Sequence, residues 1–164
     1  MTSFRRHLTS FGPTCLLAGL LLWSTLPVTA QTVGQVRDRI VRSSLDPLAV
    51  PYVWGGTQPH RGLDCSGYVL LVYGEVGLNL PRLSADQFAF TQYLRPEQVH
   101  RGDLVFFNMK LDPGRIVDHV GIYLGAGYFA HASFSRGVII EDLRSPYYQQ
   151  RLRGIRRHPA LSGG

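Results

Sequence analysis

Apolar residues recur at helical spacing in the first part of the chain and then form one continuous run. Between residues 31 and 45, valine and isoleucine recur every three or four positions with arginines between them, which predicts a short amphipathic helix. From Cys65 to Val76 nearly every residue is apolar, with Asp64 before the run and Gly77 after it. Because these flanking residues suit an N-cap and a helix stop, we expect a buried helix there.

The pattern changes from helical to alternating near Pro96. Before it, Ser84 and Gln87 have the spacing of a capping box, which predicts a third helix that ends near Leu94. After it come four short runs typical of β-strands: Asp103–Asn108, Asp118–Leu124, Tyr128–Ser133 and Gly137–Asp142. Helices followed by strands, without repeats or linkers, predict one α+β domain with helices packed on one face of an antiparallel sheet.

Alternation within the second and third of these strands determines where two histidines point. His119 lies on the face opposite the aliphatic residues of its strand. If the segment Gly125–Gly127 forms a three-residue loop with Gly127 left-handed, Gly121 lies opposite His131. Both histidines then share a face as diagonal neighbours. A two-residue turn would place them on opposite faces.

Composition supports a single globular domain preceded by a leader. The 164 residues are 45% apolar and include 18 Gly and 10 Pro, which fits a compact, loop-rich fold and excludes a coiled coil or a disordered tail. Residues 1–30 have a basic start, an apolar run at 16–26 and a small-residue end at Ala30, the pattern of a cleaved signal peptide. We therefore expect an exported domain of residues 31–164, in the periplasm, cell wall or extracellular space, with no stable membrane anchor.

The charge balance is mildly basic. Seventeen Lys and Arg against 11 Asp and Glu give +6, which suits an anionic surrounding such as a cell wall. The basic residues lack the aromatic interleaving of a nucleic-acid platform, so we expect no nucleic-acid partner. A basic cluster at Arg151–His158 fits either a solvated last strand or an anion-binding segment.

Without the leader, the chain keeps one cysteine, Cys65. A lone thiol in an exported protein is either a buried small side chain or a reactive group. In the first turn of a helix, the dipole and the free backbone N–H groups favour the thiolate, and we expect them to lower the pKa of Cys65. The same N–H groups are able to bind an oxyanion.

A base is needed beside such a nucleophile. His119 and His131 suit a Cys-His-polar arrangement, with Cys65 as nucleophile, His119 as base and His131 orienting His119. Two alternatives stay open: that both histidines are structural, and that they bind zinc with Cys65 and Asp118. The zinc site is disfavoured, because CxxC and HxxxH spacings are absent and Asp118 faces away from His119. We expect no metal and no cofactor.

Six blocks of sequence resemble one family when taken together. They are Pro51–Gly56, Asp64–Val69, Leu80–Ser84 with Gln87, Gly102–Phe107, His119–Gly125 and Phe129–Ala132. In this order, over about residues 44–157, they closely resemble the NlpC/P60 family of bacterial cell-wall cysteine peptidases. The resemblance implies a permuted papain-like fold, Cys65 and His119 as the catalytic pair, and His131 at the third, polar position. It also implies a substrate site lined by Tyr52, Asp64 and Ser84.

The resemblance implies hydrolysis of peptidoglycan stem or cross-bridge peptides, at D-glutamyl- or D-alanyl-diamino acid bonds, through a thioester. Alternatives are an acyltransferase or amidase on the same scaffold and a non-catalytic wall-binding module. We expect a monomer, localised by its basic surface or by an adaptor protein. The chain departs from the family in Ala89–Val99, which lacks an expected glycine, and in the long segment Asn108–Val117, a candidate flap.

Overall fold

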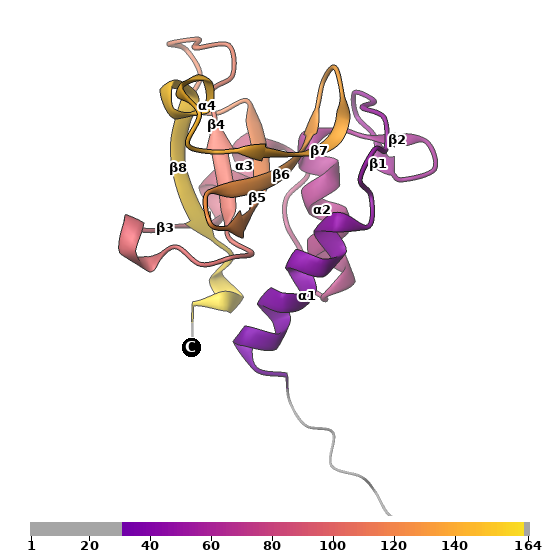
Figure 1. The fold of residues 1–164 in the computed structure, drawn as a ribbon, viewed down its shortest axis with the longest axis vertical. Coiled ribbons are helices and arrows are strands. Elements are labelled where there is room, and N and C mark those ends of the chain that lie inside the picture. Colours follow the sequence, from indigo (N-terminus) through magenta and orange to yellow (C-terminus); the bar gives the residue numbers. More distant parts are fainter. Residues whose placement is uncertain (1–30, 163–164) are drawn as a thin grey trace, which may run out of the picture. The chain divides into compact units, whose positions relative to one another are not determined.

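The structure is a computed structural model that describes residues 31–162 (Figure 1). The predicted signal peptide and its cysteine, Cys15, lie outside the described residues. Six strands form one antiparallel sheet in the order β3 (Gln92–Tyr93), β8 (Leu152–Arg157), β4 (Leu104–Phe107), β5 (His119–Gly125), β6 (Tyr128–Ser133) and β7 (Gly137–Asp142). A separate two-stranded hairpin consists of β1 (Thr57–Gln58) and β2 (Gly62–Leu63).

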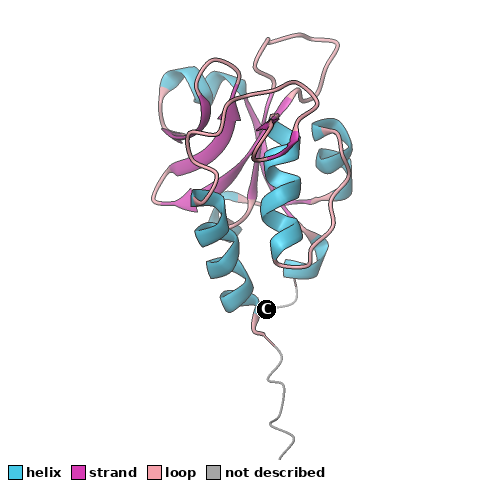
Figure 2. Cartoon of the chain, turned by 90° about the vertical axis from the view of Figure 1, so that its right-hand side faces the viewer, coloured by secondary structure: helices cyan, strands magenta, loops and turns pink. Residues whose placement is uncertain are grey.

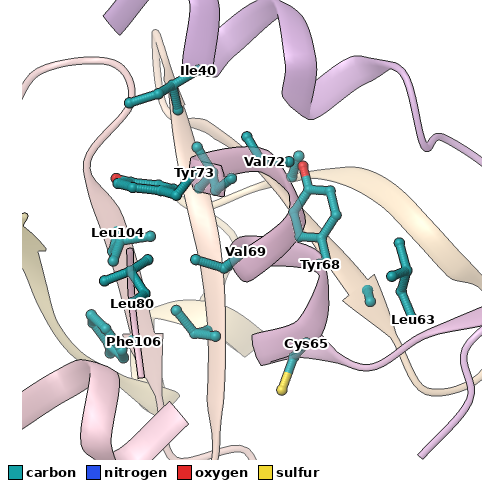
Figure 3. Close-up of a cluster of buried hydrophobic side chains, with 14 of the residues drawn as sticks. Ile40, Leu63, Cys65, Tyr68, Val69, Val72, Tyr73, Leu80, Leu104 and Phe106 are labelled. Atoms are coloured by element: carbon teal, nitrogen blue, oxygen red, sulfur yellow. The ribbon is translucent and has the colours of Figure 1, made fainter. Parts of the chain in front are cut away.

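Three helices pack against one face of the large sheet. They are α1 (Val33–Leu45), α2 (Cys65–Glu75) and α3 (Ser84–Phe90), and Figure 2 shows α1 and α2 side by side on this face. The main core forms between them and the sheet. Its members include Ile40 from α1, Val69 and Val72 from α2, and Leu104 and Phe106 from β4 (Figure 3). The expected α+β fold with helices on an antiparallel sheet is confirmed.

The opposite face of the sheet carries a smaller apolar cluster. Val105, Phe107 and Phe129 point to this side because neighbouring residues on a strand alternate between faces. Tyr148 covers them from a fourth helix, α4 (Pro146–Arg151), which the sequence reading did not predict. Two 3₁₀ turns, Pro96–Gln98 and Pro159–Leu161, complete the fold. In the part of the chain from residue 31 to residue 162, no helix combines the length and apolar character needed to cross a membrane.

The capping box predicted at Ser84 and Gln87 is wrong. Leu83 occupies the N-cap position of α3 without a side-chain hydrogen bond, and α3 ends at Phe90. Gln87 is fully buried, and its side-chain amide donates to the carbonyls of Ser66 (3.2 Å) and Pro81 (2.9 Å). The tertiary contact to α2 therefore takes the amide that a capping box requires.

The β5–β6 hairpin reaches the expected register by a different route. Its turn consists of Ala126 and Gly127 alone, both with positive φ (52° and 85°), the combination typical of a type I′ turn. A bulge between Tyr123 and Gly125 adds one residue to β5. The bulge restores the alternation that a two-residue turn by itself would have reversed, and Ile122 pairs with Ala130.

The basic tail forms β8, which lies inside the sheet between β3 and β4 and not at a solvated edge. Arg157 donates to the buried carboxylate of Asp103, and Arg156 donates to the carbonyl of Thr91. These arginines therefore tie β8 to neighbouring segments.

Candidate active site

Cys65 is the first residue of α2 and is 7% exposed. Asp64 caps the helix, because its carboxylate accepts a hydrogen bond from the backbone N–H of Gly67 at 2.7 Å. In Figure 3 the Cys65 sulfur projects from the first turn of α2 at the edge of the apolar cluster. The backbone of Val120 on β5 acts to lower the pKa of this thiol, so the sulfur lies near the strand residue that follows His119.

Burial dominates the electrostatics of the thiol. It raises the pKa of Cys65 from 9.0 to about 11, and the negative charge of Asp64 acts in the same direction. Hydrogen bonds from the backbones of Val120, Ser66 and Cys65 oppose this shift but are the smaller contribution. The backbone N–H groups at the start of α2 lower the pKa of Cys65 as expected, but burial outweighs them and the net shift is upward.

His119 and His131 meet on one face of the sheet, as the strand alternation predicts. His119 Nε2 lies 2.7 Å from His131 Nδ1, and the two ring planes are nearly perpendicular, at 89°. Both side chains are buried. Among residues 31–162, no hydrogen bond is recorded at His119 Nδ1.

Both imidazoles are neutral at pH 7. Burial lowers the pKa of His119 from 6.5 to about 4, against a smaller opposing effect from the Asp118 carboxylate. Burial, the charge of His119 and the charge of Arg136 hold the pKa of His131 well below 6.5. The shifts at Cys65 and His119 therefore favour the thiol over the thiolate and the neutral imidazole over the imidazolium.

Arg82 and Asp64 form an ion pair close to the Cys65 thiol. Arg82 forms a salt bridge with Asp64 and donates to the Ser66 hydroxyl at 2.8 Å. The Oδ2 atom of Asp64 also accepts a hydrogen bond from the backbone N–H of Gly55 at 3.0 Å. The sequence reading missed Arg82, although it lies in the quoted block Leu80–Ser84. Its position two residues before Ser84 did not indicate a role, because only the fold brings Arg82 against Asp64.

The three residues expected to line a substrate site differ in their placement. Burial raises the pKa of Tyr52 to about 12, and the charges of Cys65 and Asp64 add to the shift, so the Tyr52 phenol lies near both. The Tyr52 ring also packs on Phe134, with centroids 5.3 Å apart. Ser84 is half-buried at the start of α3, and its hydroxyl makes no hydrogen bond to the other described residues. The structure therefore brings Tyr52 and Asp64 to the thiol but records no such contact for Ser84.

The segment Asn108–Val117 is tied down at its base. The Asn108 amide donates to the carbonyls of Asp112 and Arg115, at 2.7 and 2.8 Å. The Asp118 carboxylate accepts from the backbone N–H groups of Met109 and Lys110. Asp118 therefore holds this loop, and no metal-binding group of three His, Cys, Asp or Glu side chains occurs between residues 31 and 162.

Comparisons with known proteins match the same region. The model of the NlpC/P60 family matches residues 49–157. The Gamma-DL-glutamyl hydrolase of Bacillus subtilis is 38% identical over 124 residues, which are 75% of this chain and 30% of that protein. The Murein DD-endopeptidase MepS/Murein LD-carboxypeptidase of Escherichia coli is 38% identical over 123 residues, 74% of this chain and 63% of that protein. The chain therefore spans less than two thirds of either relative.

A solved structure shows the same architecture. The crystal structure of an NLP/P60 family protein from Staphylococcus aureus superimposes on this chain with a TM-score of 0.69 at 36% identity. The match covers 82% of this chain and 45% of that one. The fold is therefore shared with a chain of detectable sequence similarity.

Proposed function

This chain belongs to the NlpC/P60 family, and from that membership we propose that it is an exported cysteine endopeptidase that hydrolyses peptidoglycan peptides. Stem or cross-bridge peptides at D-glutamyl- or D-alanyl-diamino acid bonds are the proposed substrates. The observation that carries the proposal is the 2.7 Å contact between His119 Nε2 and His131 Nδ1. His119 directly precedes Val120, whose backbone acts on the Cys65 thiol. The relatives named as murein and glutamyl hydrolases support the choice of substrate.

The proposed reaction has two steps through one covalent intermediate. The Cys65 sulfur attacks the carbonyl carbon of the scissile amide, and His119 Nδ1 takes the thiol proton as the C–S bond forms. Backbone N–H groups at the start of α2 stabilise the oxyanion. His119 then gives the proton to the leaving amine, and the C–N bond breaks to leave a thioester. Water attacks the thioester carbon and His119 takes its proton, the C–S bond breaks to release the product carboxylic acid, and His119 returns the proton to the Cys65 sulfur.

The neutral resting state explains why His131 is needed in this scheme. Because burial disfavours an imidazolium at His119, the charge that forms there during attack needs a hydrogen-bond acceptor at Nε2. His131 Nδ1 lies at that position. We therefore assign His131 to the orientation and stabilisation of protonated His119.

Digestion of purified sacculi tests the proposal directly. The full-length protein is incubated with sacculi and with isolated muropeptides, and the products are separated and identified by mass spectrometry. We expect new free amino groups on the diamino acid, released by cleavage after D-glutamate or after D-alanine, and none with Cys65→Ala. Binding to sacculi without any cleavage would contradict the proposal and favour the non-catalytic wall-binding module.

A further inference from the structure

Tyr148 lies directly behind His131. It extends from α4, on the sheet face opposite the helices α1 to α3, and is 5% exposed. Its hydroxyl lies 3.4 Å from His131 Nε2, the ring nitrogen that faces away from His119. The Tyr148 ring packs edge-on against Phe129, with centroids 4.8 Å apart, and against Phe107 at 5.5 Å. This packing holds the hydroxyl at the outer end of the row Cys65, His119 and His131.

The proton on His131 has two alternative positions, and only one supports a base at His119. When His119 Nδ1 is to accept the thiol proton, the proton of neutral His119 is on Nε2, which donates to His131 Nδ1. His131 Nδ1 must then be an acceptor, so the proton of neutral His131 is on Nε2. Among the described residues, Tyr148 Oη is the hydrogen-bond partner recorded at that nitrogen.

The surrounding charges keep both partners in the required protonation state. Arg136, in the turn between β6 and β7, lowers the pKa of His131 and forms a salt bridge with Glu141 on β7. The charge of His119, on β5, likewise disfavours protonation of His131. Burial raises the pKa of Tyr148 to about 12, so its hydroxyl stays neutral and able to accept a hydrogen bond.

We propose that Tyr148 is a positioning residue for the hydrolysis: its hydroxyl accepts the Nε2–H of His131 and thereby selects the tautomer that accepts from His119. This inference rests on the proposed role of His119 as the base toward Cys65. Tyr148 touches neither substrate nor sulfur and acts only through His131. Without the hydroxyl, neutral His131 carries its proton on Nδ1. Two N–H groups then point at each other, that of His131 Nδ1 and that of His119 Nε2, and His119 turns away from the thiol.

The test compares Tyr148→Phe with Tyr147→Phe in the full-length protein. Tyr147 is the matched control, because it neighbours Tyr148 in α4 and packs against its ring, but it is half exposed and forms no hydrogen bond to a histidine. The tautomer of His131 is measured by long-range ¹H–¹⁵N NMR. The rate of Cys65 alkylation by iodoacetamide is measured at pH 7 and pH 10, by mass spectrometry of the peptide that contains Cys65.

In Tyr148→Phe we expect His131 to shift toward the Nδ1–H tautomer and alkylation at pH 7 to slow about 5- to 10-fold, the loss of one hydrogen bond. At pH 10 the two rates should converge, since the fraction of the thiol that hydroxide then ionises reacts without His119 and carries most of the alkylation. Tyr147→Phe should match the wild type in every measurement. An unchanged tautomer, an unchanged rate at pH 7, or equal slowing at both pH values would overturn the inference.

The outcome is separable from that of the proposed function. Alkylation and the tautomer are measured without peptidoglycan, so they judge Tyr148 even if the wild type fails to cleave sacculi. If the wild type does cleave them, kcat for muropeptides should fall in Tyr148→Phe by a factor similar to that for alkylation, with KM unchanged. A rise in KM with constant kcat would also overturn the inference, because it would place Tyr148 in substrate binding.

Discussion

The properties of the site originate in the burial of single residues. Cys65 and His119 are both buried, and burial disfavours the charged form of each, so their pKa values move apart to about 11 and about 4. A helix N-terminus acts on Cys65 in the opposite direction, but its backbone hydrogen bonds are the smaller effect. Proton transfer to His119 must therefore accompany attack by the sulfur.

Substitution of the thiol should abolish cleavage without unfolding the protein. Cys65→Ser keeps the size of the side chain, but a hydroxyl is a weaker nucleophile, and His119 with a pKa of about 4 is too weak a base to activate it. We expect kcat/KM for muropeptides to fall more than about 1000-fold in Cys65→Ser and Cys65→Ala. Melting temperatures should stay within a few degrees of the wild type. His60→Ala, in the exposed β1–β2 turn, is the control.

Near-wild-type turnover by Cys65→Ser would contradict the cysteine mechanism.

The pH dependence of hydrolysis should be broad. His119 must be neutral to act as base, and its pKa of about 4 predicts that kcat/KM falls only as the pH drops toward that value. On the alkaline side, Cys65 stays a thiol until about pH 11. A pH profile of muropeptide cleavage measures both limits. An acid limit near 6.5, the ordinary value for histidine, would show that burial does not lower the pKa of His119 in the working enzyme.

Stability should decline in acid for the same reason. Because the folded pKa of His119 lies below its unfolded value of 6.5, the unfolded chain binds more protons between pH 6.5 and about 4. The free energy of unfolding therefore falls as the pH is lowered through this window, by about 3 kcal/mol from His119. Urea denaturation at pH 7 and pH 4.5 measures this loss. His119→Gln, which does not titrate, should lose correspondingly less, and an equal loss in both proteins would contradict the assignment.

At the scale of elements, the β5–β6 hairpin positions the two histidines. The turn residues Ala126 and Gly127 and the bulge before Gly125 together set the register that places His131 beside His119. Gly121, on the same face, leaves room for this contact, since a Cβ there would lie 2.7 Å from the Ala130 carbonyl and 3.1 Å from His131 Cβ. The site therefore depends on the backbone of this hairpin as much as on its side chains.

Gly127→Val should impair catalysis through this hairpin. At φ 85° a valine is strained by about 1–2 kcal/mol, and its Cβ would lie 2.7 Å from the Arg144 side chain. A displacement of His131 by about 1 Å lowers turnover on the order of 100-fold, more than the loss of stability alone explains. Turnover and urea denaturation are measured together.

The control for this substitution is Ala126→Gly, which removes the strain of a positive φ (52°) without adding atoms. It should leave turnover unchanged and unfold no more readily than the wild type. If Gly127→Val lost stability but kept full turnover, the hairpin would not position His131.

At the scale of the whole molecule, Asp103 joins segments from both ends of the chain. It is fully buried and forms salt bridges with Arg37 of α1 (2.9 Å) and Arg157 of β8 (2.8 Å). It also accepts the backbone N–H of His100 at 2.8 Å. The carboxylate therefore fixes the first helix and the last strand to β4, although none of these residues touches the site.

Asp103→Asn should destabilise the fold more than any surface change. It removes the charge that pairs the buried Arg37 and the partly buried Arg157, a change that costs about 3–5 kcal/mol. Asp142→Asn, whose salt bridge with Arg144 lies on the surface, should change stability little. Thermal and urea unfolding of the two variants are compared. A loss below about 1 kcal/mol in Asp103→Asn would show that the arginines are solvated and independent of Asp103.

Local patterns in the sequence determined most elements and the central residues of the site. The strands at Tyr128–Ser133 and Gly137–Asp142 have the predicted bounds, and Asp64 caps the helix that begins at Cys65. Alternation along a strand is a property of its own backbone, so it placed His119 opposite the aliphatic residues of β5 correctly. The face that His119 shares with His131 depended in addition on the hairpin bulge. These features depend on residues close together in the chain.

Only the tertiary structure decided what depends on distant partners. Gln87 bonds to the Ser66 carbonyl in place of its predicted cap, and the basic tail enters the sheet between β3 and β4. The bulge before Gly125, the position of Tyr148 behind His131, and the direction of the pKa shift at Cys65 likewise follow from packing. Burial and long-range hydrogen bonds are set by the whole fold, and no local pattern of residues specifies them.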